Sequence, residues 1–200
     1  MSTGHANRSK TVASVGANSP LWGQGLVIVL SIVHATAVPA QTPANVPPPS
    51  LDHGAACAFF QLKKEYQRAI DHCDQALLND PNNDNVLSNR GSAYFSLGKL
   101  DEALRDFNAA MLLKPQNARN FFNRALVHGA KKDHQRAIAD YDEAIRLMPD
   151  LAIAYNNRGS EFEASGERDK AISDYREALR LSPSLSPVIM PNLRRLGAEP

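Results

Sequence analysis

Residues 152–183 read AIAYNNRGSEFEASGERDKAISDYREALRLSP. Apolar and small residues recur on one face of each half, at the period of about 3.6 residues that an amphipathic helix requires. Gly166 separates the halves, and glycine readily takes the positive φ found at a helix C-terminus. Pro183 ends the second half, because proline cannot continue a helix. The stretch therefore predicts two antiparallel helices joined by a tight turn.

The same pattern occurs four times without an insertion. Steps of 34 residues backward from Pro183 reach Pro149, Pro115 and Pro81. The alanines of the second half keep the same register, at positions 69, 103, 137 and 171 and again at 76, 110, 144 and 178. A fixed period of about 34 residues is a signature of helical repeat arrays. One such hairpin cannot bury its own apolar face, so the copies must stack.

The pattern resembles the tetratricopeptide repeat, over roughly residues 50–184, and the whole is similar to small exported bacterial proteins of that kind. The second-half alanines, the closing prolines and two small residues of the first half, Gly91 and Gly159, carry the resemblance. It implies an all-α, right-handed α-solenoid of four 34-residue helix-turn-helix repeats. Their predicted boundaries are 50–83, 84–117, 118–151 and 152–184.

Two repeats depart from the pattern. In the third, Lys132 stands where glycine is expected and His128 where an aromatic ring is expected, so its turn is the less well specified. The first has Cys57 at the small position and Cys73 at the aromatic one, and a terminal repeat is expected to be atypical because one face lacks a neighbour.

Residues 185–200 are expected to form a C-terminal capping helix and tail. Ser186 is the predicted N-cap, with proline at the first helical position. Pro191 should kink or shorten the helix. Its apolar stripe would cover repeat four, with Arg194 and Arg195 facing away from it.

The first forty residues predict a signal peptide. Leu26–Val38 is an apolar core, short for a membrane span, and small residues follow it at the spacing of a cleavage site after Ala40 or Ala37. Residues 41–49 are a proline-rich linker. We expect export to the periplasm, with no membrane span in the mature chain. The alternative is an uncleaved N-terminal membrane anchor.

Composition argues against several classes of function. The formal net charge is +1, with no basic block, so nucleic acid is not an expected partner. The serines and histidines form no nucleophile motif, and no phosphate-binding glycine loop is present. We expect no enzyme activity, no catalytic residues, no cofactor and no metal.

Asparagine recurs at one first-helix position, as Asn89, Asn123 and Asn157. A side-chain amide has both a donor and an acceptor, which matches a peptide unit. The resemblance implies that asparagines here line a concave groove and hold the backbone of an extended ligand. The alternative is a solvated amide, or one satisfied by the neighbouring helix. The remaining predicted groove residues are Ser92, Phe95, Arg119, Phe122, Leu126, Asn156 and Ser160. Arg119 is the only cation among them, so a clamp for a C-terminal carboxylate is not supported.

Arginine and aspartate also recur together, in every repeat but the first. Arg90, Arg124 and Arg158 lie in first helices, and Asp106, Asp140 and Asp174 in second helices. We expect exposed pairs that bridge the two helices of a repeat, each stabilising by about 0–1 kcal/mol. The alternative is that both are solvated surface charges.

The tetratricopeptide pattern sets Cys57 and Cys73 across from each other in the first hairpin, which predicts a disulfide. An exported protein meets an oxidising compartment, where a disulfide persists. The alternatives are two buried thiols, or a metal site with His53. A fourth metal ligand would have to be His72, which we expect to point elsewhere.

These features predict a non-catalytic module that binds a protein or an extended peptide through the concave groove of an exported solenoid. The runner-up is a structural scaffold of an envelope assembly, which would use the convex face or the open first repeat. A metal-dependent enzyme is the third and weakest alternative.

Overall fold

The computed structural model describes residues 52–199, and within that range the chain is helical without a β-strand. The helices are α1 (His53–Leu62), α2 (Tyr66–Asn79), α3 (Asp84–Ser96), α4 (Leu100–Leu113), α5 (Ala118–Ala130), α6 (His134–Leu147), α7 (Ala152–Ala164), α8 (Arg168–Leu181), the 3-10 turn η1 (Pro183–Leu185) and α9 (Ser186–Arg195). The prediction of an all-α fold is confirmed.

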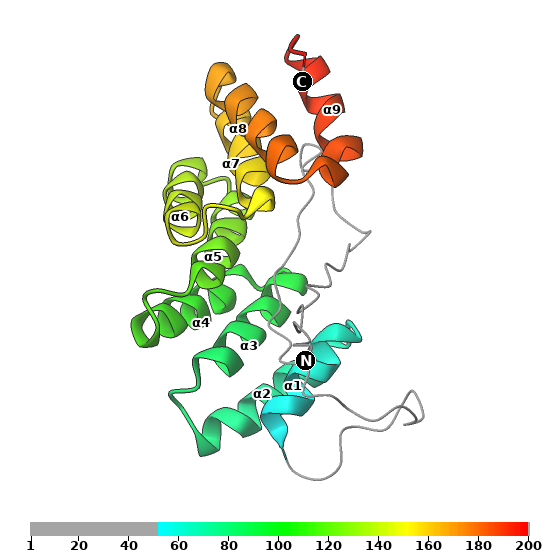
Figure 1. Ribbon diagram of the computed structural model, residues 1–200. Helices are drawn as coiled ribbons and strands as arrows, with labels where there is room; N and C mark the ends of the chain where they lie inside the picture. Colours follow the sequence, from blue (N-terminus) through cyan, green and yellow to red (C-terminus); the bar gives the residue numbers. More distant parts are fainter. Residues whose placement is uncertain (1–51, 200) are drawn as a thin grey trace, which may run out of the picture.

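The helices pack as consecutive pairs, α1 with α2 through to α7 with α8. Each first helix from α3 onward also packs against the second helix of the preceding pair. Figure 1 shows the pairs stacked in chain order, with α1 and α2 at one end and α9 at the other. The result is the predicted α-solenoid, in which each repeat contacts mainly its neighbours.

A small residue facing a large ring joins the two helices of a repeat. A Cβ atom added to Gly91 would lie 3.1 Å from the Phe107 ring, and one added to Gly159 would lie 3.0 Å from the Tyr175 ring. Both rings are fully buried. The close approach explains why the first helix needs a small residue there.

One residue in each turn between paired helices takes a positive φ. These are Lys64 (60°), Gly98 (75°), Lys132 (61°) and Gly166 (80°). The N–H of the next residue donates to the carbonyl five positions before it, at 2.8–3.0 Å in all four turns, which is the Schellman arrangement of a helix end. The turn of the third repeat therefore forms despite its lysine.

The C-terminal helix differs from its prediction at both ends. Ser186 is its first residue rather than its cap, because η1 precedes it, and Pro191 lies inside the helix without ending it. Ile189 and Leu193 are fully buried against repeat four, as the apolar stripe predicted. Arg195 does not face away. It forms a two-bond pair with Glu163 of α7, at 2.8 Å in each bond, which fastens α9 to the last repeat.

The predicted signal peptide and linker lie outside the described residues. Among residues 52–199, no helix has both the length and the apolarity needed to cross a bilayer.

Candidate functional site

The ten predicted groove residues all lie on the first helices α3, α5 and α7. We call the face built by α1, α3, α5 and α7 the first-helix surface. The repeat spacing brings Asn89, Asn123 and Asn157 to equivalent positions on α3, α5 and α7.

The row is more buried than an open groove would require. Asn89, Asn123 and Asn157 are 5%, 2% and 5% exposed. Ser92, Phe122, Leu126 and Asn156 are also buried. Phe95, Arg119 and Ser160 are partly exposed and are the predicted residues most open to solvent.

Several polar groups on this surface are engaged locally. Ser92 donates to the Ser88 carbonyl at 2.9 Å, and Ser160 donates to the Asn156 carbonyl at 3.2 Å. Ser88 also lies 2.6 Å from the Oδ1 atom of Asn120, which links α3 to α5. Asn120 is fully buried. The sequence analysis missed it, because the neighbouring repeats have valine and alanine at this position. Its partner also lies 32 residues away, which differs from the 34-residue period.

Asn156 and Asn157 form a coupled amide pair on α7. The Nδ2 atom of Asn156 donates to the Oδ1 atom of Asn157 at 3.0 Å. Within residues 52–199, the Oδ1 atom of Asn156 is buried and accepts no hydrogen bond. The buried Nδ2 atom of Asn157 has the Tyr141 hydroxyl as its neighbour. The Asn157 amide lies near the buried Tyr141 hydroxyl, where it counteracts the raising of that pKa by burial.

Nearly all ionised side chains of the first helices have a partner. Asp84 pairs with Lys114 at 2.8 Å, and Glu163 pairs with Arg195. Glu161 lies 2.7 Å from His134; burial raises the pKa of this carboxyl, and the histidine opposes the rise. Arg119 differs, because no carboxylate of residues 52–199 lies within ion-pairing distance of it.

The recurring arginines connect three helices instead of two. Each guanidinium makes two bonds, of 2.6–2.8 Å, to the aspartate of its own repeat. Each makes a third, of 2.6 Å, to the second helix of the preceding repeat: Arg90 to Asp74, Arg124 to Asn108 and Arg158 to Asp142. We call these contacts the arginine bridges.

The expectation of exposed pairs is wrong for the arginine bridges. The aspartate side chains are only 6–8% exposed and the arginines 18–25%. Burial raises the pKa of Asp106 and Asp174, and the facing guanidinium opposes that rise. The hydrogen bonds that Arg90 donates to Asp106 raise the pKa of Arg90. The carboxylates therefore depend on their arginines, which favours a structural role.

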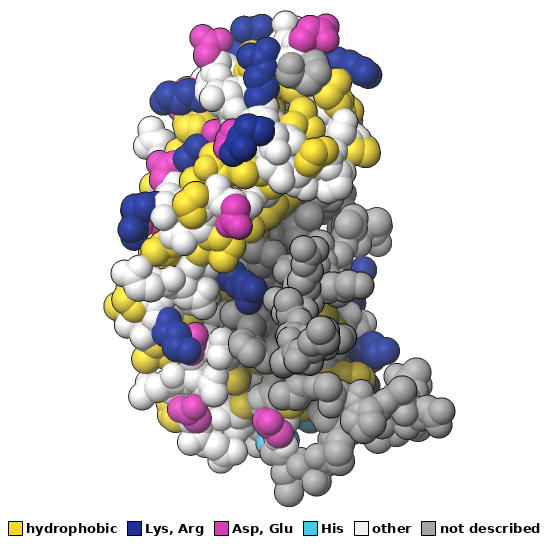
Figure 2. All heavy atoms as spheres, viewed as in Figure 1, with side chains coloured by type: hydrophobic (Ala, Val, Ile, Leu, Met, Phe, Trp, Pro, Cys, Tyr) yellow, Lys and Arg dark blue, Asp and Glu magenta, His cyan; other side chains and the backbone are white. Residues whose placement is uncertain are grey.

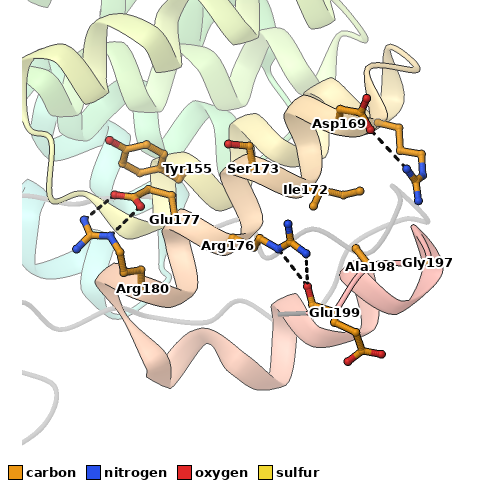
Figure 3. A pocket seen from close by; sticks show the side chains of 11 residues that line it. Tyr155, Asp169, Ile172, Ser173, Arg176, Glu177, Arg180, Gly197, Ala198 and Glu199 are labelled. Carbon is orange, nitrogen blue, oxygen red and sulfur yellow. Dashed lines mark hydrogen bonds and ion pairs between the residues drawn. The ribbon is translucent and has the colours of Figure 1, made fainter.

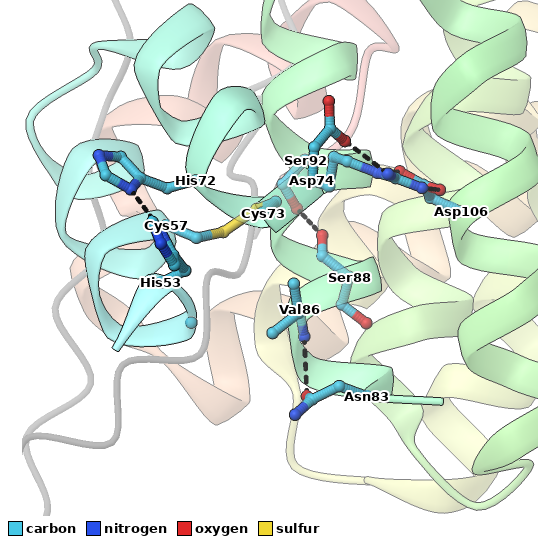
Figure 4. The surroundings of a disulfide bond; sticks show 12 residues. His53, Cys57, His72, Cys73, Asp74, Asn83, Val86, Ser88, Ser92 and Asp106 are labelled. Atoms are coloured by element: carbon cyan, nitrogen blue, oxygen red, sulfur yellow. Dashed lines mark hydrogen bonds and ion pairs between the residues drawn. A yellow bond between two sulfur atoms is a disulfide. The ribbon is translucent and has the colours of Figure 1, made fainter. Parts of the chain in front are cut away.

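A disulfide joins Cys57 of α1 to Cys73 of α2, with Cα atoms 5.0 Å apart. It takes the place of the small residue and ring of the other repeats, and Figure 4 shows it between the two helices. The expectation that His72 points elsewhere is wrong. His72 faces His53, and their Nδ1 atoms lie 3.0 Å apart. Residues 52–199 contain no group of three or more His, Cys, Asp or Glu side chains placed to hold a metal ion.

An open depression of about 1010 Å³ lies between α8 and the C-terminal tail, away from the predicted row. Figure 3 shows Arg176 directed at the Glu199 carbonyl, with bonds of 3.1 and 2.7 Å, and Arg180 paired with Glu177. Its arginines are thus held by this chain's own oxygens. On the described part of the face in Figure 2, positive and negative side chains are interspersed.

Family models match four segments of the chain. One described as "TPR repeat" matches residues 91–132, and three described as "Tetratricopeptide repeat" match residues 72–105, 118–151 and 152–185. A search of curated proteins found no match.

Solved structures with the same fold include three that are informative. MamA is 26% identical with a TM-score of 0.60, over 64% of this chain and 74% of its own. The first TPR of Spaghetti (RPAP3), bound to the HSP90 peptide SRMEEVD, is 30% identical with a TM-score of 0.55, over 57% of this chain and 90% of its own. YrrB, described as a TPR protein with an unusual peptide-binding site, is 20% identical with a TM-score of 0.60, over 66% of this chain and 68% of its own, and shows the fold alone.

Proposed function

Because the chain belongs to the tetratricopeptide repeat proteins, we propose that it binds an extended segment of a partner protein in a concave groove along its first-helix surface. The repeats, together with a similar domain that holds a peptide, support a protein-binding module. In this proposal the protein does no chemistry of its own.

One observation carries the groove proposal: the row of asparagines at equivalent positions of α3, α5 and α7. Arginine, leucine and glutamate are better helix formers, so helix propensity does not explain the choice of asparagine. A repeated amide can pair with the backbone of a ligand that runs along the array. Phe95, which is partly exposed, would add an apolar contact.

Site-specific crosslinking tests this proposal. A photoreactive phenylalanine analogue would replace either Phe95 on the first-helix surface or Leu112 on α4, whose side chain is 87% exposed. We expect the Phe95 probe to capture a partner, and the triple change of Asn89, Asn123 and Asn157 to alanine to reduce that capture while helical circular dichroism is kept. Capture through Leu112 alone would contradict the groove proposal.

The alternative is a scaffold that associates through its second helices. Leu78 and Leu112 support it, because they occupy the same position in successive repeats and are 74% and 87% exposed. The corresponding residues of the next two repeats are Arg146 and Arg180, each paired with a glutamate three residues before it. The Leu112 probe described above distinguishes this alternative.

We also propose export, with cleavage after Ala40 or Ala37. The Cys57–Cys73 disulfide supports an oxidising compartment, since such bonds are rare in the cytosol. Cleavage would remove Trp22, the only tryptophan. Terminal sequencing and tyrosine-only fluorescence of the exported protein test this proposal, and an intact N-terminus would contradict it.

A further inference from the structure

The second helices of the first two repeats each present a row of residues on the side away from their buried residues. We call these rows the outer stripes. Their members are exposed or partly exposed, and spacings of three and four residues place them on one face of each helix. The stripe of α2 is Arg68, Asp71, Gln75 and Leu78, and that of α4 is Glu102, Arg105, Ala109 and Leu112. Each member of one stripe occupies the same repeat position as its counterpart in the other.

Both outer stripes end in a leucine that lies in water. Leu78 and Leu112 are 74% and 87% exposed. At the same position the last two repeats have Arg146 and Arg180, each paired with a glutamate three residues before it. The leucines are the members of these faces that would gain by contact with another apolar surface.

The charged members of the two outer stripes are opposite in sign at equivalent positions. Arg68 on α2 corresponds to Glu102 on α4, and Asp71 corresponds to Arg105. Within residues 52–199 no ion pair joins α2 to α4, because the pairs of Arg68 and Arg105 stay on their own helices. The reversal of sign therefore serves no contact inside the described part of the molecule.

Asp71 and Arg105 are the members of this pattern most available to another molecule. Asp71 forms no ion pair within the described residues, and Arg105 is 75% exposed with a single partner at 4.0 Å. Arg68 is more engaged, because it pairs within α2 and its guanidinium lies 4.0 Å from the centre of the Phe60 ring.

A two-fold axis between α2 and α4, parallel to both helices, would use all of these features. Equivalent helices of stacked repeats run in the same direction. Rotation by 180° about this axis lays α2 of one chain against α4 of a second copy, with equivalent positions facing each other. Leu78 then faces Leu112 of the second copy, Asp71 faces its Arg105, and the two-fold symmetry makes each contact twice.

The last two repeats could not form the same contact. An equivalent axis between α6 and α8 would set Arg146 against Arg180 of the second copy, and Arg136 against its Lys170. Like charges placed against each other are unfavourable in an interface. The complementarity is thus particular to the first two repeats.

We infer that two copies of this chain associate through the outer stripes of α2 and α4 about a two-fold axis, with leucine on leucine and Asp71 on Arg105. This surface is separate from the proposed groove, and it names a second copy as the partner in the scaffold alternative. Only two helices of each copy take part, so we expect a weak and reversible dimer.

Exchange of the paired charges tests the inference, by sedimentation equilibrium of the full-length protein. Asp71→Arg would set arginine against arginine in both contacts, and Arg105→Asp would set aspartate against aspartate. Each variant alone should dimerise about tenfold more weakly than the wild type. An equimolar mixture of the two should return to within about threefold of the wild type, because each contact then joins an arginine to an aspartate.

Two further variants assign the contact to its residues. Leu112→Ser should weaken dimerisation about tenfold or more, since the loss occurs twice in a two-fold dimer. The matched control is Ala139→Arg, which adds a charge at the exposed position of α6 that corresponds to Asp71 and should leave dimerisation unchanged. Helical circular dichroism checks that every variant is folded.

The outcomes separate this inference from the groove proposal. A wild type that stays monomeric at about 1 mM overturns the inference and leaves the groove to the Phe95 probe. If both charge variants dimerise as well as the wild type, or their mixture does not recover, α2 and α4 do not face each other. Species larger than two chains would contradict a closed two-fold contact.

Discussion

At the residue scale, the arginine bridges show why a recurring charge pair can be structural. Each guanidinium satisfies a buried aspartate and also reaches the preceding repeat, so its removal leaves two groups without a partner. Breaking a buried ion pair costs more than breaking an exposed one, since the remaining charge stays out of water.

We predict that Arg158→Leu lowers the free energy of unfolding by about 2–4 kcal/mol. Arg158 is 18% exposed and its partner Asp174 is 8% exposed. The control is Arg146→Leu, because Arg146 is 60% exposed in a pair with Glu143 and its loss should cost about 0–1 kcal/mol. Urea unfolding followed by circular dichroism measures both, and equal losses would show that the bridge is no stronger than a surface pair.

A second residue-scale prediction concerns pH. Burial lowers the pKa of His128, an effect that Asp140 opposes. In the unfolded chain its pKa is the ordinary value of about 6.5, so below that pH the unfolded state takes up the proton first. Stability should therefore fall as the pH drops from about 6.5 toward the lower pKa of the folded state.

The variant for this prediction is His128→Phe, because Phe60 and Phe162 occupy the same position in other repeats. Urea unfolding at about pH 7.5 and about pH 5.5 should show a larger loss of stability for the wild type than for the variant. The other histidines are common to both proteins, so the difference between the two proteins reports on His128. An equal loss in both would assign the acid sensitivity to other groups.

At the element scale, the turns are set by one position in each repeat. We predict that Gly98→Ala destabilises the protein by about 1 kcal/mol, because its φ of 75° is unfavourable for any residue with a Cβ atom. No atom would clash with that Cβ, so the effect would come from the backbone alone.

The reciprocal change Lys64→Gly should not destabilise the protein. It should raise the free energy of unfolding by up to about 0.5 kcal/mol, since glycine relieves the backbone strain but loses more entropy on folding. Thermal unfolding compares the two, and a neutral Gly98→Ala would contradict the explanation.

The same scale shows how far the sequence predicts the structure. The 34-residue register predicted consecutive helix pairs, because the closing prolines such as Pro149 recur in phase. It specified the turns less well, because lysine replaces glycine at Lys64 and Lys132. The register did not predict η1, which shifts the start of α9. The C-terminal segment occurs once, so there is no second copy with which its boundaries could be compared.

The candidate site was less predictable. The register identified the position of Asn157 but not its burial, which depends on how closely neighbouring helices pack. The sequence did contain evidence for the third bond of each bridge, because Asp74 and Asp142 lie at the same position of their repeats. Asn108 occupies that position in the repeat between them, so the acidic residues do not recur in every repeat and the pattern was overlooked.

At the scale of the whole molecule, the disulfide acts at one end of an array whose repeats contact mainly their neighbours. We predict that its reduction lowers the free energy of unfolding by about 3 kcal/mol in the chain-entropy model, for a loop of this size. Hydrogen exchange should rise mainly in α1 and α2 and remain unchanged in α7 and α8. Unreduced protein and the double variant Cys57→Ala, Cys73→Ala would be compared by mass spectrometry. A uniform rise over all helices would mean that the array unfolds as one unit.

The arginine bridges also determine where the array can be lengthened. If a copy of the third repeat were inserted before the fourth, the bridge arginine of the copy would face Asp142 of the original third repeat. The copy's own equivalent of Asp142 would then face Arg158. A copy appended after α8 would instead meet Arg176, which stands where the earlier repeats have Asp74, Asn108 and Asp142. Two guanidinium groups would then face each other. We therefore expect a duplication of the third repeat inside the array to be tolerated better than the same copy added after α8.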